Sequence, residues 1–465
     1  MKGFVFWGLT ATVMLAPLPF ASNRPWSWSL LSLMVGFWLI LWALRALLDF
    51  RPGAVSDPKQ AVIQVPWARH ALATILFLTL VGWFALQASS LAPAAWHHPF
   101  WATAQSVLKN AADAAISLNP INSITGLMRI LAYAGVFFLA LQYGRRSSRA
   151  KKMVWALCLA GAVYALYGVM AYFSGDKMIL WFPKWAYLDS LTSTFVNRNT
   201  FATYAGVTLL VTIVLLLAEI ERATPYGLMS RAGWMDFMEN LSPRLFFLAG
   251  ATVVMATALL LTHSRGGFVS TLVGLFVLFL GMALNRKKRT RTLVASVVLT
   301  VLAGYVLLDI SGGETLSRLG NIDSQWNNRK EVHSLTLEAI ADSPKWGTGL
   351  GTYGDVFYQH RGTDFYVWTP TFDKAHNTYL EFALEAGLVP TAALVVLFAL
   401  LFLMTLRGVL KRQRNAAYPC LGLAATALVG THALIDFSMQ IPGMAVTYFY
   451  LMGMACAQSW SSSEA

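Results

Sequence analysis

The run FVNRNTFATYAGVTLLVTIVLLLAE at 195–219 decides the fold class. It contains no charged residue between Thr200 and Ala218, and a helix needs about 20 mostly apolar residues to cross the hydrocarbon core of a bilayer. The run therefore predicts a membrane-spanning helix. A polar block that contains an arginine stands directly at its start.

The same apolar character extends over all 465 residues. The hydrophobic set makes up 57% of the chain and charged residues only 12%, against about 25% charged in a soluble domain. Mean hydropathy is +0.55. This composition excludes a disordered chain and an ordinary soluble enzyme. The net charge of +13 reflects basic clusters between apolar runs, so we expect no nucleic-acid partner.

Twelve apolar segments are long enough to span a membrane. They cover 4–22, 27–48, 70–89, 124–143, 152–173, 199–219, 244–262, 267–285, 292–310, 377–406, 417–436 and 441–459. We expect the tenth to bend near Gly387 and Pro390. Since only Lys2 precedes the first span and the second follows at once, we expect the first to be retained and not cleaved as a signal peptide. The pattern predicts an all-α polytopic integral membrane protein, with 1–465 as a single transmembrane domain.

Lysine and arginine concentrate in alternate loops. Examples are GRRSSRAKK at 144–152, NRKKRTR at 285–291 and RGVLKRQR at 407–414. Because cytoplasmic loops carry the excess of basic residues, these loops predict the cytoplasmic side, and twelve crossings place both termini there. The longest loop, 311–376, lies between spans nine and ten and is expected on the opposite face.

That loop predicts an ordered element. Asn327 or Asn328 is placed to cap a helix that runs through Ile340, and GTGLGTYGD at 347–355 is a glycine-rich turn. No strand and no GxxxxGK[ST] helix start surround this turn, so we expect no nucleotide P-loop. The three cysteines have no CxxC spacing, so neither a zinc site nor a disulfide framework is indicated.

Four charged or titratable residues stand at the outer ends of predicted spans: Arg198, Arg265, His376 and Asp436. An arginine in this position is as well explained by simple anchoring at lipid phosphates. Two features favour a ligand. Arg198 lies between Asn197 and Asn199, which would be costly facing lipid. Arg265 precedes two glycines that allow close backbone approach, and guanidinium groups bind phosphates bidentately.

His376, followed by Asn377, is a candidate general base because histidine titrates near neutral pH. An isolated histidine here is also explained as a helix-end residue. The remaining histidines show no HxxxH spacing and no paired carboxylates accompany a phosphate-like motif, so we expect no metal site. Asp436 is most simply a hydrogen-bonded partner of a nearby basic or amide group.

These residues resemble the motifs of the O-antigen ligase and O-antigen polymerase superfamily of bacterial envelope glycosyltransferases. The resemblance rests on FVNRN at 195–199, SRGG at 264–267, the long outer loop with Arg329, then Pro344 and GTGLGTYG at 347–354, and HNTYLE at 376–381 with Gly387 after it. Their order identifies an O-antigen ligase-like core across 195–400, with 311–376 as a periplasmic loop.

The resemblance implies a GT-C-type membrane fold in the bacterial inner membrane with an active site facing the periplasm. It implies a donor glycan on undecaprenyl diphosphate, an inverting transfer, and no nucleotide, metal or other cofactor. Arg198 and Arg265 would bind the diphosphate, and His376 would activate or orient the acceptor. Candidates to assist are Arg329, Asn197, Asn199, Asn377 and Asp436.

The acceptor stays open at this point. Family ligases transfer glycan to lipid A core, polymerases join repeat units, and related oligosaccharyltransferases modify protein. The last option is weakened because the chain ends at SSSEA soon after the twelfth span. The ligase reaction is the leading prediction and a polymerase for O-antigen or exopolysaccharide the second. A flippase for a lipid-linked glycan is the alternative from another functional class. A translocation path would be expected to need charged residues in mid-span, and few lie there.

Overall fold

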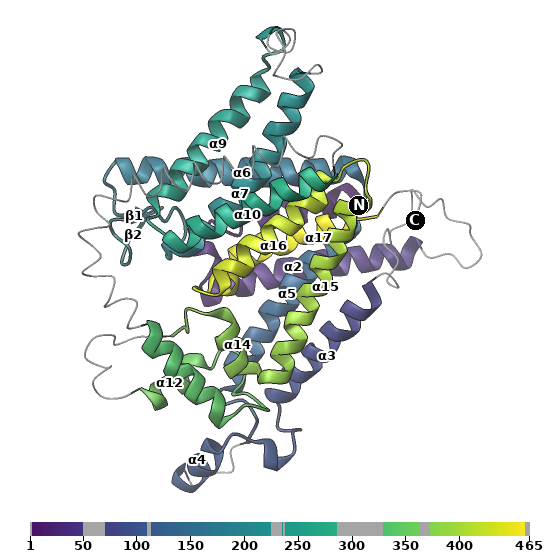
Figure 1. Cartoon of the computed structure of the whole chain (residues 1–465). Coiled ribbons are helices and arrows are strands. Elements are labelled where there is room, and N and C mark those ends of the chain that lie inside the picture. Colours follow the sequence, from purple (N-terminus) through teal and green to yellow (C-terminus); the bar gives the residue numbers. More distant parts are fainter. Residues whose placement is uncertain are drawn as a thin grey trace.

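The computed structural model describes residues 2–49, 70–108, 113–224, 235, 238–285, 329–361 and 373–460. Within these ranges the protein is mostly helical, with long helices packed into one bundle and short elements gathered at one end of it (Figure 1).

The long helices follow the predicted spans. They are α1 (Lys2–Leu15), α2 (Pro25–Asp49), α3 (Ala71–Gln87), α5 (Pro120–Gly144), α6 (Ser147–Phe173), α7 (Arg198–Ala223), α9 (Pro243–Leu261), α10 (Arg265–Asn285), α15 (Leu388–Lys411), α16 (Ala417–Ala433) and α17 (Pro442–Ala457). In the part of the chain that the structure describes, seven helices are long and apolar enough to cross a membrane: α2, α5, α6, α7, α9, α10 and α15. The prediction of a helical multi-pass membrane protein is thus confirmed. The expected span at 292–310 lies outside the described residues, so the total of twelve stays a prediction, as does the GT-C-type fold.

The shorter elements are α4 (Phe100–Leu108), α12 (Tyr353–His360), α14 (Thr378–Ala386) and the 3₁₀ turns η1 (Phe20–Ser22), η3 (Ala94–Trp96) and η4 (Ser438–Gln440). Residues 329–342 are also helical, close to the helix predicted from Asn327 or Asn328 to Ile340. An antiparallel pair of short strands, β1 (Met178–Ile179) and β2 (Phe182–Pro183), was not predicted.

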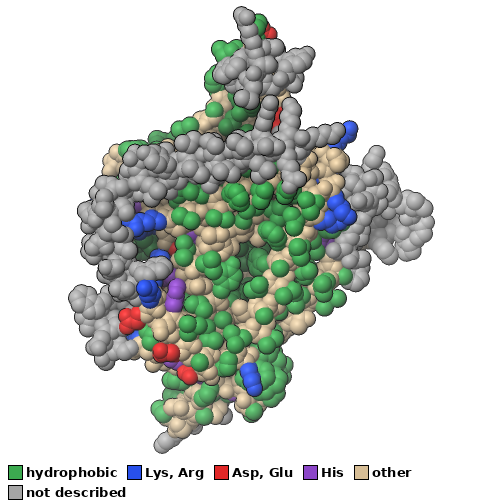
Figure 2. Space-filling model, viewed as in Figure 1, with side chains coloured by type: hydrophobic (Ala, Val, Ile, Leu, Met, Phe, Trp, Pro, Cys, Tyr) green, Lys and Arg blue, Asp and Glu red, His purple; other side chains and the backbone are tan. Residues whose placement is uncertain are grey.

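Close helix packing accounts for the buried centre of the bundle. A Cβ on Gly453 of α17 would collide with the Phe137 carbonyl oxygen of α5, and one on Gly267 of α10 would collide with Ala202 of α7. Small residues let helix backbones approach in this way when the surrounding lipid is as apolar as the side chains. Figure 2 shows hydrophobic side chains over the middle of the visible face and charged ones toward its margins.

The tenth predicted span breaks into two helices at Gly387, so the predicted bend is confirmed. Gly387 has φ +89°, a conformation that favours glycine, and a Cβ there would press against the Lys345 carbonyl. Leu388 N donates to Pro344 O at 2.9 Å. The loop before α14 therefore rests on this break, with α14 on the loop side and α15 as the long apolar helix beyond it.

Basic residues from separate loops gather at the opposite end of the bundle. Arg145, after α5, donates to the Trp460 carbonyl at 2.6 Å, and Arg412, after α15, bonds the same oxygen. Arg407 lies over the Trp460 ring, 5.4 Å from its centre. The loops predicted to share one face do lie together, whereas the compartment that they face stays a prediction.

Candidate functional site

The starts of α7 and α10 and the end of α16 meet the segment that precedes α14. Beyond the Gly267–Ala202 contact, the end of α10 reaches the turn after α16, because a Cβ on Gly266 would collide with Ile435. Thr378 Oγ1 donates to the Asp436 carbonyl at 2.9 Å and ties α14 to the same turn. Residues far apart in the sequence are thereby brought to one end of the membrane region.

Arg198 is the first residue of α7, and its neighbours explain its position. The Asn197 side chain accepts from Asn199 N at 2.7 Å and Thr200 N at 3.2 Å, which caps the helix. Arg198 Nη1 donates to Ser190 Oγ at 3.1 Å, and the guanidinium lies 5.3 Å from the centre of the Tyr187 ring. Asn197 is therefore occupied with capping, and the guanidinium is held over the loop that precedes it.

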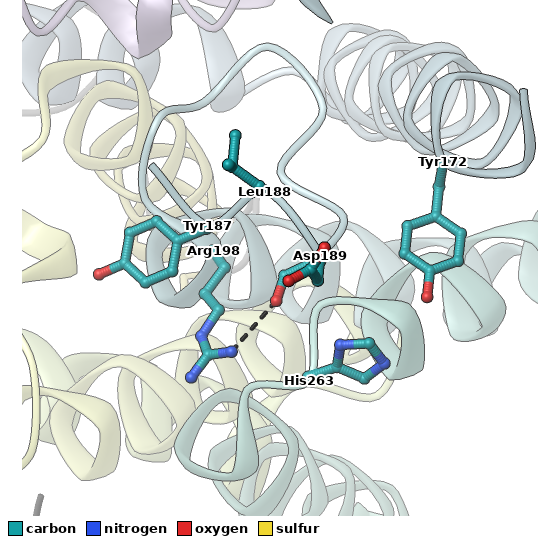
Figure 3. Close-up of a pocket in the computed structure, with 7 residues that line it drawn as sticks. Tyr172, Tyr187, Leu188, Asp189, Arg198 and His263 are labelled. Atoms are coloured by element: carbon teal, nitrogen blue, oxygen red, sulfur yellow. Dashed lines mark hydrogen bonds between the residues drawn. The ribbon is translucent and has the colours of Figure 1, made fainter. Parts of the chain in front are cut away.

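A cavity of about 430 Å³ opens beside Arg198. It is lined by Tyr172, Tyr187, Leu188, Asp189, Ser190, Arg198 and His263. Figure 3 shows Arg198, Asp189 and His263 around the same space, with Tyr172 and Tyr187 on opposite sides. Arg265 begins α10 two residues after His263, but its side chain is exposed and is not among those that line this cavity.

Next to this region the half-buried His376 lies beside the buried Asp436. His376 Nδ1 lies 3.8 Å from Asp436 Oδ1, longer than a direct hydrogen bond. Asp436 Oδ1 accepts from Phe437 N at 2.7 Å, and the Asn199 side chain lies close enough to the carboxylate to limit the rise of its pKa on burial. The predicted role of Asp436 as a partner of an amide or basic group agrees with this geometry.

The pair has shifted protonation equilibria. Burial, together with the cationic Arg329 and with His333, lowers the pKa of His376 to about 4. Burial raises the pKa of Asp436 to about 6, while its hydrogen bonds and the nearby arginines limit the rise. At neutral pH His376 is therefore neutral and Asp436 is charged.

Asn377 caps α14 as Asn197 caps α7. Its side chain accepts from Tyr379 N at 3.0 Å and Leu380 N at 3.1 Å. Both asparagines of the sequence motifs therefore start helices, and each start lies beside a motif residue, Arg198 or His376. The positive ends of two helix dipoles are thus directed toward one region, an arrangement that favours anions.

The helix at 329–342 contributes two residues to this region. Arg329 lies near enough to lower the pKa of both His376 and Asp436. His333, which the sequence left without a role, lies close to Ala375 and His376: burial lowers the pKa of His333, the Ala375 backbone limits that fall, and His333 contributes to the lowered pKa of His376. The sequence signal for His333 was its position four residues after Arg329 on a predicted helix, because residues with this spacing lie on the same helix face.

The glycine-rich turn packs instead of binding a ligand through its amides. Gly347, Gly349 and Gly351 all have positive φ. Thr348 N donates to Leu384 O at 3.0 Å and Gly349 N to Glu385 O at 2.9 Å. The turn therefore docks on α14. Among the described residues no group of His, Cys, Asp or Glu is arranged to hold a metal ion, and Cys158, Cys420 and Cys456 are buried free thiols.

Residues 250–395 match the O-antigen ligase family model. The resemblance drawn from the motifs is thus confirmed for this segment, which contains Arg265, Arg329 and His376 and lies inside the expected core 195–400. Arg198 precedes it.

The chain is also similar to the exopolysaccharide production protein ExoQ of Rhizobium meliloti (strain 1021). The two are 25% identical over 211 residues, a match that covers 43% of this chain and 48% of the relative. The chain thus spans about half the length of the curated relative that it matches. Together the two similarities connect the chain with the assembly of envelope and extracellular glycans.

Proposed function

We propose that this protein is a glycosyltransferase that moves a glycan from undecaprenyl diphosphate onto an acceptor glycan, lipid A core, at the periplasmic face of the inner membrane. The observation that carries the proposal is the convergence at one end of the bundle of Arg198, two helix N-termini and the His376–Asp436 pair. His376 and the start of α14 lie within residues 250–395, the segment that matches the O-antigen ligase family, whereas Arg198, the start of α7 and Asp436 lie outside it.

Arg198 is the proposed ligand of the diphosphate. Its guanidinium is fixed before substrate arrives by Ser190 and Tyr187, so little reorganisation is needed when charge develops on the leaving group. The starts of α7 and α10 add partial positive charge. Arg265, exposed at the start of α10, is the second proposed ligand and would close on the diphosphate from the solvent side.

His376 is the proposed partner of the acceptor. The acceptor hydroxyl attacks the anomeric carbon, the bond from that carbon to the diphosphate oxygen breaks with inversion, and the hydroxyl proton passes to the imidazole. The neutral state of His376 leaves a ring nitrogen able to accept this proton. A pKa of about 4 makes a weak base, and a bound diphosphate would raise it because nearby negative charge favours the imidazolium. Asp436 would stabilise that imidazolium from 3.8 Å.

A repeat-unit polymerase is the second candidate. The similarity to a protein named for exopolysaccharide production supports it. The donor chemistry is the same in both reactions, so the two candidates differ in the acceptor alone.

A reconstituted assay tests the proposal. The purified protein in nanodiscs receives an undecaprenyl-diphosphate glycan with a chelator and without nucleotide, and lipid A core or repeat units are offered separately. Transfer to lipid A core supports the ligase, and transfer to repeat units replaces it by the polymerase. Movement of donor between leaflets without transfer to either acceptor would instead favour a flippase.

Labelling of single introduced cysteines tests the orientation. The native cysteines are buried, so an impermeant maleimide would report the new thiol. Asp342→Cys, on the helix before Ser343, should react in intact cells, and Arg414→Cys, after α15, should react only after lysis. The reverse pattern would place the site on the wrong side for the donor.

A further inference from the structure

The backbone of His376 adopts a conformation that its side chain does not favour. Its φ is +50°, in the left-handed region, where residues other than glycine are uncommon. Such conformations persist when surrounding contacts fix them, and they cluster at functional sites. The contacts that fix this one can be named.

Glu381 holds the two residues before His376. It lies one turn into α14 and is buried, and its Oε1 accepts from Lys374 Nζ at 3.0 Å. Its Oε2 accepts from Ala375 N at 3.0 Å. One carboxylate thereby closes the segment from Lys374 to His376 back onto the helix that follows.

The ion pair between Glu381 and Lys374 can hold the segment that carries His376 in place. The Glu381 side chain is 2% exposed and that of Lys374 24%. Although burial alone would lower the pKa of Lys374, the carboxylates of Glu381 and Glu385 raise it. The lysine therefore stays charged at every physiological pH. Breaking such a buried pair from one side would leave an uncompensated charge.

A second contact reaches the same segment from the outer loop. His333, on the helix at 329–342, lies close enough to the backbone of Ala375 for that backbone to limit the lowering of the imidazole pKa by burial. The peptide groups next to His376 are thus held by α14 on one side and lie beside the loop helix on the other. Neither Glu381 nor Lys374 contacts the cavity beside Arg198, so neither is required there for donor binding.

We propose that Glu381, through its contacts with Lys374 and Ala375, is a positioning residue that holds His376 in the left-handed conformation and directs its ring toward Asp436. The proposal rests on the proposed role of His376 in transfer. Glu381 touches no substrate, and its effect on the reaction passes through His376.

Glu385 provides a matched control. It is buried on the same face of α14, one turn after Glu381, but its Oε1 accepts from Tyr353 N at 3.1 Å and not from the segment that carries His376. Removal of either carboxylate disturbs the same helix. Only removal of Glu381 releases His376.

A double-mutant cycle separates positioning from general stabilisation. Glu381→Ala should lower kcat about 10²-fold, the cost expected for a misplaced catalytic group, with the KM for donor nearly unchanged. In a His376→Ala background the same change should cause no further loss. Glu385→Ala should lower kcat by the same factor in the parent protein and in the His376→Ala variant. Equal losses from Glu381→Ala in both backgrounds would overturn the proposal.

Two further measurements keep the test decisive. Glu381→Gln has nearly the shape of glutamate and retains an oxygen for Ala375 N, so it should fold and show an intermediate loss. Carbethoxylation of His376, measured by mass spectrometry against His97 in the same sample, should change in rate in Glu381→Ala and stay as in the parent in Glu385→Ala. An unchanged labelling rate at His376 in Glu381→Ala would refute the proposal that Glu381 positions His376. If the parent transferred glycan to no acceptor, the proposed function would fail, and the labelling alone would decide this inference.

Discussion

Arg198→Lys tests the proposed diphosphate site most directly. Lysine keeps the positive charge at the start of α7 but replaces a planar fork by a single ammonium group. It also loses the geometry that now bonds Ser190 Oγ at 3.1 Å and stacks 5.3 Å from the centre of Tyr187. The perturbation therefore removes directed contacts and leaves the net charge unchanged.

The size of the effect follows from the number of bonds lost. A bidentate arginine makes two bonds to a diphosphate and lysine reproduces one of them. A hydrogen bond to a charged group contributes about 1.5–3 kcal/mol. Loss of one such bond from the transition state corresponds to a fall in kcat/KM of roughly 10- to 150-fold. Loss of the contact between Arg198 and Ser190 would lower kcat/KM further.

The assay is transfer from undecaprenyl-diphosphate glycan by the purified protein, with kcat/KM measured for donor. Arg222→Lys is the matched control, because Arg222 lies near the opposite end of the same helix, is largely exposed and pairs with Glu219 at 3.1 Å. It should leave transfer unchanged. If Arg198→Lys also kept the full rate while Arg198→Ala lost it, charge alone would be sufficient. If all three variants were fully active, Arg198 would merely anchor the helix.

Four further predictions concern His376, its neighbour Asp436 and the glycine-rich turn. His376→Ala should lower transfer by about 10²–10⁴-fold, and recovery in His376→Gln would assign it to orienting the acceptor and not to proton transfer. In thermal unfolding, Asp436→Asn should become more stable as pH rises from about 4 to 6.5. In this pH range His376 is neutral in the folded variant, whereas the same histidine binds a proton in the unfolded chain. His376→Gln should instead lose stability as pH rises from 3.8 to about 6, since folded Asp436 retains a proton that the unfolded chain releases. Gly347→Ala should lower the free energy of unfolding by more than about 1 kcal/mol, since φ is +66° and the new Cβ would strike the Glu385 carbonyl; an unchanged melting temperature would contradict this.

The membrane helices could be predicted because lipid imposes one dominant rule, that a spanning segment is apolar and long enough. Their ends were less accurate. The predicted span 152–173 begins at Lys152, whereas α6 begins at Ser147. Charged residues at the end of a spanning helix extend into water, so hydropathy alone stops short of the true start.

The site could be predicted only as far as local chemistry reaches. Asparagine before a helix signals a cap, and Asn197 and Asn377 both act as caps. The contacts of His333 and Glu381 with Ala375 are tertiary contacts, which a single sequence does not reveal. The cavity beside Arg198 depends likewise on the loop before α7, where no sequence pattern predicted the short strand pair.

These contacts divide the site into two structural parts. Arg198 is held by α7 and by the loop immediately before it, so the proposed donor side needs only the membrane region. His376 is held by α14 and lies beside the helix at 329–342, which belongs to the loop that rests on the break at Gly387. Disturbance of that loop should therefore affect the acceptor step first. Asp436 lies between the two parts: its carboxylate is 3.8 Å from His376, and both Arg198 and Asn199 lie close enough to limit the rise of its pKa on burial. This buried carboxylate therefore links the proposed donor and acceptor sides.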